Sequence, residues 1–276
     1  MSLAPRVTPF FHRASSTWSY VVADPQTGGA AIIDPVLDFD PASRRASTES
    51  AQALREYVEA EQLDVRWILE THAHADHFSA GRWLKQLWPT ARLAIGKGIA
   101  CVQATFLAHH EGTGGFATDG SQFDHLFEDD ADFAIGALAA RVIAVPGHTS
   151  DSSAYLIGDA LFTGDSLFMP DGGTARCDFP GGDAATLFRS IQRLYALPEA
   201  TRVFVCHDYG PGGRDVACQT SIEAQKRDNI HVRVGMGEAE FVRQREARDA
   251  TLPEPALLRL AIPANLAGGT LPDISV

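Results

Sequence analysis

The sequence is short of cysteine, of positive charge and of long apolar runs. Only 4 of its 276 residues are cysteine, and none forms a C-x-x-C pair, so we expect reduced, mostly buried thiols rather than a disulfide scaffold. Lys and Arg number 23 against 35 Asp and Glu, and a net charge of −12 disfavours nucleic acid as a partner. The longest apolar run, about residues 133–140, is far shorter than the roughly 18 residues that a membrane span needs, so we expect no membrane partner.

What remains is the composition of an ordinary globular protein, with 45% hydrophobic and 21% charged residues. Residues 1–13 hold no apolar run long enough for a secretory signal, which predicts a cytoplasmic protein. A chain of 276 residues lies within the size range of one α/β unit, and no internal repeat is visible. We therefore predict a single domain over residues 1–276 with one large core.

The first third of the chain alternates apolar runs with turns. Residues 20–33 predict a hairpin, and apolar positions at helical spacing predict a helix over 51–58. Residues 65–69 predict a strand, and 78–88 a helix that Pro89 ends. The segment between these last two elements is therefore a loop that leaves a strand and enters a helix.

The rest of the chain repeats this alternation. Helices are predicted over 100–109, after the N-cap Asp183, and over 216–227 and 238–248, with a glycine-rich loop over 110–122. Strands are predicted over 141–145, 154–157, 161–163 and 202–206, and the proline-spaced tail from Thr251 is predicted to be extended. This order of strands and helices indicates an α/β (α+β) protein with two sheets stacked between helical layers.

The loop after the strand at 65–69 holds four potential metal ligands in six residues, His72-Ala-His74-Ala-Asp76-His77. Side chains at positions i and i+2 of an extended segment point the same way, so His72 and His74 can share one metal. Asp76 and His77 follow the turn and can face a second position. Imidazole nitrogens and carboxylate oxygens suit zinc, iron and manganese.

Three later segments place a similar ligand where a predicted strand ends. His148 follows Val145-Pro146-Gly147, Asp165 follows Thr163-Gly164, and His207 follows Val205-Cys206. Each alone is more typical of an ordinary loop residue. Their order after the histidine cluster indicates one composite metal site.

With these motifs the sequence resembles the metallo-β-lactamase superfamily over roughly residues 18–210. The resemblance implies an αββα sandwich with its metals at one edge. The residue patterns predict that residues 211–276 follow this core as C-terminal helices and an extended tail. In dinuclear members, residues matching His72, His74 and His148 hold one metal and those matching Asp76, His77 and His207 the other. The residue matching Asp165 bridges the two. All seven positions are intact, which argues against a binding module that has lost its catalytic function.

Two subfamilies are similar to this sequence. Hydroxyacylglutathione hydrolases (glyoxalase II) share T-H-x-H-x-D-H, P-G-H-T, G-D-x-L-F and a late G-H-[ED]-Y, in which Cys206 replaces the glycine here. Persulfide dioxygenases, the ethylmalonic encephalopathy protein group, share these motifs and add two more. Arg176-Cys177-Asp178-Phe179 resembles their R-x-D-F segment, and Ala261-Ile262-Pro263-Ala264-Asn265-Leu266 resembles their A-V-P-A-N-M ending.

The dioxygenase resemblance is the preferred one, and it implies one Fe(II) per chain held by His72, His148 and Asp165. The other four candidates would orient these ligands or form an empty second site. The expected reaction is oxidation of glutathione persulfide to sulfite. The alternative is a thioester hydrolase with two Zn(II), which lower the pKa of a bridging water.

The dioxygenase and the hydrolase hypotheses both imply a small-molecule glutathione substrate, which carries carboxylates. Arg176 is the predicted cation for one of them, and the other interpretation is an ion pair between Arg176 and Asp178. Asp178 and Tyr209 are the further predicted substrate contacts. Because chains of this family are often dimers, the resemblance also suggests a homodimer.

Overall fold

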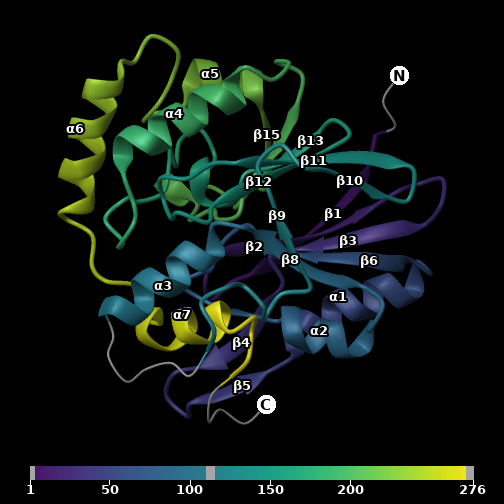
Figure 1. Ribbon diagram of the computed structural model, residues 1–276. Coiled ribbons are helices and arrows are strands. Elements are labelled where there is room, and N and C mark those ends of the chain that lie inside the picture. Colours follow the sequence, from purple (N-terminus) through teal and green to yellow (C-terminus); the bar gives the residue numbers. More distant parts are fainter. Residues whose placement is uncertain (1–3, 110–115, 272–276) are drawn as a thin grey trace.

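Two six-stranded sheets lie face to face, and helices cover the outer face of each (Figure 1). The computed structural model describes residues 4–109 and 116–271. The order of the first sheet is β1-β2-β3-β6-β8-β9 and that of the second is β10-β11-β12-β13-β14-β15. A small sheet, β5-β4-β7, lies beside the first. The predicted αββα sandwich is thereby confirmed.

The strands are short and mostly buried. Those of the first sheet are β1 (Arg6–His12), β2 (Thr17–Ala23), β3 (Gly29–Ile33), β6 (Asp64–Leu69), β8 (Arg92–Gly96) and β9 (His125–Phe127). Those of the second are β10 (Asp132–Ile135), β11 (Leu138–Ala144), β12 (Ser153–Ile157), β13 (Ala160–Phe162), β14 (Arg202–Phe204) and β15 (Gln219–Ser221). The small sheet has β4 (Val36–Asp40), β5 (Arg45–Ser47) and β7 (Phe78–Ser79).

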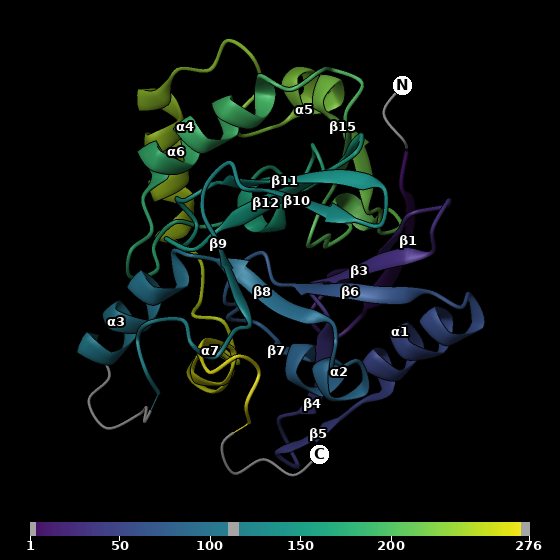
Figure 2. The same cartoon turned by 45° about the vertical axis from the view of Figure 1, so that its right-hand side comes forward.

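The helices divide between the two outer faces, as the turned view also shows (Figure 2). The first sheet is covered by α1 (Glu49–Ala60), α2 (Gly81–Leu87), α3 (Ile99–His109) and α7 (Leu258–Leu266). The second is covered by α4 (Ala184–Tyr195), α5 (Ile222–Asp228) and α6 (Glu238–Asp249). Two short 3₁₀ turns, η1 (Gly164–Ser166) and η2 (Pro211–Gly213), complete the described elements.

Local sequence explains most of these elements. The predicted hairpin is β2 paired antiparallel with β3, and the predicted strand at 65–69 is β6. The carboxylate of Asp183 caps α4 by accepting from the Thr186 backbone N–H at 2.7 Å, which confirms the predicted cap. Between the sheets, aromatic side chains such as Tyr20 and Phe162 fill a common core.

Two predicted elements differ from the structure. The helix predicted at 78–88 begins only at Gly81, because residues 78–79 pair with β4 as β7. The segment 219–221 is strand β15 rather than helix, because it pairs antiparallel with β14 at the sheet edge. Of the loop predicted at 110–122, residues 110–115 lie outside the described residues, and 116–122 contain no helix or strand.

The prediction of an extended tail is wrong. Residues 258–266 form α7, although Pro263 lies inside it. A proline in a helix leaves the carbonyl four residues earlier without its donor. Here that residue is Arg259, whose side chain is 83% exposed, so water can reach this part of the turn. The apolar face of α7, with Ala261, Ala264 and Leu266, is buried against the first sheet's helical layer and β7.

No helix in the described ranges has both the length and the apolarity to cross a bilayer.

Candidate metal centre

All the predicted metal ligands follow the ends of strands at one edge of the sandwich. The loop with His72 and His77 leaves β6, and His148 follows β11. Asp165 lies in η1 after β13, and His207 follows β14. Because β13 and β14 are parallel neighbours, their carboxyl ends bring Asp165 and His207 together.

The first ligand group contains His72, His148 and Asp165. One ligand atom from each lies within 4.8 Å of the others. Asp165 Oδ2 is 3.9 Å from His72 Nε2 and 3.6 Å from His148 Nε2. This group has the composition of a site with two histidines and one carboxylate, which leaves other coordination positions open.

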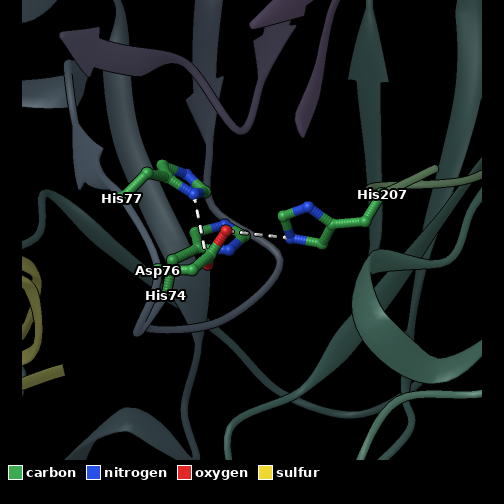
Figure 3. Close-up of side chains that lie close together, drawn as sticks. All are labelled: His74, Asp76, His77 and His207. Atoms are coloured by element: carbon green, nitrogen blue, oxygen red, sulfur yellow. Dashed lines mark ion pairs between the residues drawn. The ribbon is translucent and has the colours of Figure 1, made fainter. Parts of the chain in front are cut away.

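The second ligand group contains His74, Asp76, His77 and His207, again within 4.8 Å (Figure 3). Asp76 lies between two of the rings, with Oδ1 3.3 Å from His77 Nδ1 and Oδ2 3.6 Å from His207 Nε2. Within the second group, His74 adjoins the first group, because its ring centroid is 4.0 Å from that of His72 and 4.2 Å from that of His77. Asp165 also faces both groups, because its Oδ1 is 3.4 Å from His207 Nε2.

These residues fit a metal ion because several of their buried polar atoms have no hydrogen-bond partner. Within the described part of the chain, the buried side-chain atoms without a hydrogen-bond partner include His74 Nδ1, Asp76 Oδ2, His77 Nε2 and Asp165 Oδ1. A buried polar atom without a partner is costly, and so many in one place are what a metal-binding site presents. Imidazole nitrogens and carboxylate oxygens are the donors that iron and zinc accept.

Burial sets the charge of these ligands. It lowers the pKa of His72 and of His74 well below the usual value, and neighbouring histidines lower it further. Both rings are therefore neutral near pH 7, the form that binds a metal. Burial opposes ionisation of Asp76, but His207 and His77 outweigh it and hold the pKa of this carboxyl well below its usual range. Burial raises the pKa of Asp165.

Hydrogen bonds fix which nitrogen of the first-group histidines faces the site. His148 Nδ1 donates to the Arg176 carbonyl at 2.6 Å. The Thr71 hydroxyl donates to Asp34 at 2.9 Å, so at 3.1 Å it can accept from His72 Nδ1. In both rings Nε2 then keeps its lone pair and points toward Asp165.

Two residues that support the ligand loop were missed in the sequence. The Asp34 carboxylate accepts from the Thr71 backbone N–H at 2.7 Å and lies 3.1 Å from His74 Nε2. The Asn265 side-chain amide donates to the carbonyls of His74 and His77, and its oxygen accepts from the Ser79 N–H, each at 2.8 Å. The sequence features that could have pointed to these two residues are Asp34-Pro35 after β3 and the Pro-Ala-Asn segment of the tail.

A cavity of about 830 Å³ opens onto the metal centre, and it is lined by the whole first ligand group together with Asp76 and His207 of the second. The aromatic rings of Phe168, Phe179 and Tyr209 line it, as do three arginines. Tyr209 is 64% exposed, and its ring is stacked 6.0 Å from that of His207. The volume is in the range of small-molecule sites in proteins.

The predicted substrate residues lie at this cavity with their charges already paired. Arg176 lines it, whereas Asp178 is not among the described lining residues. The Arg176 guanidinium donates to both Asp178 oxygens, at 2.6 and 2.7 Å, and to the Pro253 carbonyl at 2.7 Å. It also lies 5.0 Å from the Phe179 ring centroid. The other interpretation from the sequence, an ion pair between Arg176 and Asp178, is therefore present in the structure.

The sequence pattern of the Metallo-beta-lactamase superfamily matches residues 12–207, which hold every metal-ligand candidate. The chain belongs to this superfamily. Among solved structures, ETHE1 from Myxococcus xanthus has a TM-score of 0.75 and 32% sequence identity, over 96% of this chain and 99% of that one. The resemblance stated from the motifs is thus confirmed at the level of the superfamily.

Curated superfamily relatives carry different names. The Beta-lactamase hydrolase-like protein of Agrobacterium fabrum is 50% identical over 98% of this chain, which spans 62% of that protein's length. Glyoxylase B2 of Dictyostelium discoideum is 45% identical, over 99% of this chain and 94% of that protein. The mitochondrial persulfide dioxygenase ETHE1 of Homo sapiens is 28% identical, over 94% of this chain and 87% of that protein.

Proposed function

We propose that this member of the superfamily is an iron-dependent persulfide dioxygenase that oxidises glutathione persulfide. The balanced reaction takes the persulfide, O₂ and water to glutathione, sulfite and two protons. The outer sulfur is oxidised by four electrons, and O₂ accepts them. Fe(II) bound at the site would supply the redox chemistry that the reaction of O₂ with a sulfur substrate requires.

The observation that carries this proposal is the first ligand group. His72 and His148 both present Nε2 toward Asp165 Oδ2, and all three side chains line the cavity. Two histidines and one carboxylate are the ligand set of non-haem iron oxygenases. The likeness to ETHE1 of Myxococcus xanthus, which covers nearly all of both chains, supports the same assignment.

The chain's own side chains prepare the site in two further ways. The Arg176 carbonyl and Thr71 hold the His148 and His72 rings in one tautomer, so neither ligand has to reorganise. Phe168 and Phe179 line the cavity with apolar surface, which limits the water around a bound sulfur.

The second candidate is a glyoxalase II-like hydrolase of glutathione thioesters that uses two zinc ions. The second ligand group favours it, since Asp165 faces both groups and is placed to bridge them. The 45% identity to Glyoxylase B2 of Dictyostelium discoideum points the same way.

One comparison of substrates and metals decides between the two. The protein is loaded anaerobically with one equivalent of Fe(II), or with two equivalents of Zn(II), and given glutathione persulfide or S-lactoylglutathione. We expect the iron form to consume oxygen and release sulfite from the persulfide. Rapid hydrolysis of S-lactoylglutathione, with no oxygen uptake on the persulfide, would overturn the proposal in favour of the hydrolase.

A further inference from the structure

The charged side chains that line the outer part of the cavity are paired, with one exception. Four pairs involve lining residues and have their closest nitrogen–oxygen distances between 2.6 and 3.1 Å. They are Arg176–Asp178, Arg214–Asp171, Arg245–Asp249 and Arg259–Glu254. Each pairing leaves its lining residue with little net charge to offer a ligand.

The exception is Arg248, in the last turn of α6. It is exposed, it lines the cavity, and it has no ion-pair partner among residues 4–109 and 116–271. Its neighbour on the same helix, Arg245, is buried, is paired with Asp249 and donates to the Thr174 carbonyl. Arg248 is therefore the one cation of the described cavity lining whose charge is not already neutralised.

The nearby histidine does not compete for this role. His231 also lines the cavity, and burial, helped by Arg245 and Arg248, lowers its pKa to about 4. It is neutral near pH 7, and its Nδ1 accepts from the Thr174 N–H at 3.0 Å. An anion that enters this part of the cavity meets a neutral imidazole and one free guanidinium.

We propose that Arg248 binds a carboxylate of the substrate, and so selects anionic thiol compounds such as glutathione. This inference rests on the proposed function for the nature of the sulfur group. It moves the main carboxylate contact from Arg176, which shares its guanidinium with Asp178, to α6. A guanidinium can hold a carboxylate through two parallel hydrogen bonds, and the metal centre and Arg248 line the same cavity.

The test measures binding of reduced glutathione itself to the metal-loaded protein by calorimetry. Arg248→Ala is compared with Arg243→Ala, which removes the same charge from the same helix at an exposed residue outside the cavity lining. We expect Arg248→Ala to weaken binding about tenfold or more, as the loss of a charged hydrogen bond does, and Arg243→Ala to leave it unchanged. Arg248→Lys should recover part of the affinity.

Two results would overturn the inference: equal affinities in Arg248→Ala and Arg243→Ala, or no binding of glutathione to the unmodified chain at millimolar concentration. Turnover measurements distinguish a failure of this inference from a failure of the proposed function. If glutathione binding depends on Arg248 but the persulfide drives no oxygen uptake, the dioxygenase assignment fails and this inference stands. If Arg248→Ala oxidises the persulfide with unchanged KM, the dioxygenase assignment stands and this inference fails.

A substrate series adds a second readout. For Arg248→Ala we expect a raised KM with glutathione persulfide and an unchanged kcat, because the carboxylate contact is the same in the ground and transition states. The persulfide of 2-mercaptoethanol, which carries no carboxylate, should show the same KM in the variant and the unmodified chain. An equal rise in KM for both substrates would count against a carboxylate contact.

Discussion

The side-chain amide of Asn265 donates a hydrogen bond to the backbone carbonyl of His77, 188 residues earlier in the chain, at 2.8 Å. The same amide group holds the carbonyl of His74 and the N–H of Ser79. The C-terminal helix α7 thus fixes the loop that carries four of the seven metal-ligand candidates. A motif near the end of the sequence has its effect at the metal centre.

Replacing Asn265 should loosen this loop. Asn265→Ala leaves three buried backbone groups without partners, and each costs about 1–3 kcal/mol. We expect a clearly lower Tm and a weaker hold on the metal, measured by competition with a chelator. Asn265→Asp keeps the acceptor for the Ser79 N–H but sets a buried carboxylate oxygen against the two carbonyls, so we expect it to be at least as destabilising as Asn265→Ala. Arg259→Ala, on the exposed side of the same helix, is the control, and equal metal retention in both alanine variants would contradict the role of Asn265.

The pair formed by Arg176 and Asp178 changes what we expect of an Arg176 variant. From the sequence alone, Arg176→Ala should raise KM for the glutathione substrate. Because Asp178 already takes up the guanidinium, we expect a smaller rise in KM than in Arg248→Ala, together with a lower Tm. A double-mutant cycle with Asp178→Ala should give a coupling of at most about 1 kcal/mol, since Asp178 is 37% exposed. A larger KM effect in Arg176→Ala than in Arg248→Ala would restore Arg176 as the main carboxylate contact.

The four cysteines should differ sharply in reactivity. Cys101 is exposed, Cys218 is half-buried, and Cys177 and Cys206 are buried, so the prediction of mostly buried thiols holds for two of the four. Burial raises the pKa of Cys177 to about 12, which leaves almost no thiolate there at pH 8. With a thiol reagent at pH 8 we expect fast modification of Cys101 alone, removed in Cys101→Ser. Fast modification of Cys177 in the folded protein, seen by peptide mass spectrometry, would contradict this.

Local patterns predicted the parts of the fold and site that depend on neighbours in sequence. Periodicity predicted β6 and the helix over 51–58, and the loop that holds the ligands follows from the strand before it and the helix after it. The i, i+2 spacing predicted that His72 and His74 share one metal, whereas the structure places His74 in the second ligand group. His148, Asp165 and His207 could be recognised because each follows a strand end and because their order resembles a known family.

Contacts between distant segments were not visible in this way. The tail was predicted as extended because proline normally interrupts a helix, yet tertiary packing of Ala261 and Ala264 outweighs that preference. The Pro-Ala-Asn segment is visible in the sequence, but nothing there shows which backbone groups Asn265 meets. Arg248 has no sequence signal either, since its role depends on which other charges around the cavity are already paired.

Asp165 and Asp76 provide the test of one metal against two. Asp165 Oδ2 faces both His72 and His148, so Asp165→Ala removes one of three protein ligands, and we expect activity to be abolished. Asp76 contacts His77 and His207 instead. If iron binds at the first ligand group alone, Asp76→Ala changes only a neighbour of the ligands. Such changes cost about 10–100-fold, so oxygen uptake with glutathione persulfide should stay measurable.

Metal content must be measured on the same samples, because the affinity order of divalent ions favours zinc over iron and an overexpression host can load the wrong metal. Protein from iron-supplemented cells should hold one iron per chain, and Asp76→Ala should keep it, whereas Asp165→Ala should lose it. Asp64→Ala, which removes an exposed carboxylate at the start of β6, is the control for charge. Two tightly bound zinc ions per chain, with equal and total loss of activity in both site variants, would instead mean that the two ligand groups work together. That result would favour a hydrolase, because Asp165 and Asp76 would both be needed to hold the two metals that activate the attacking water.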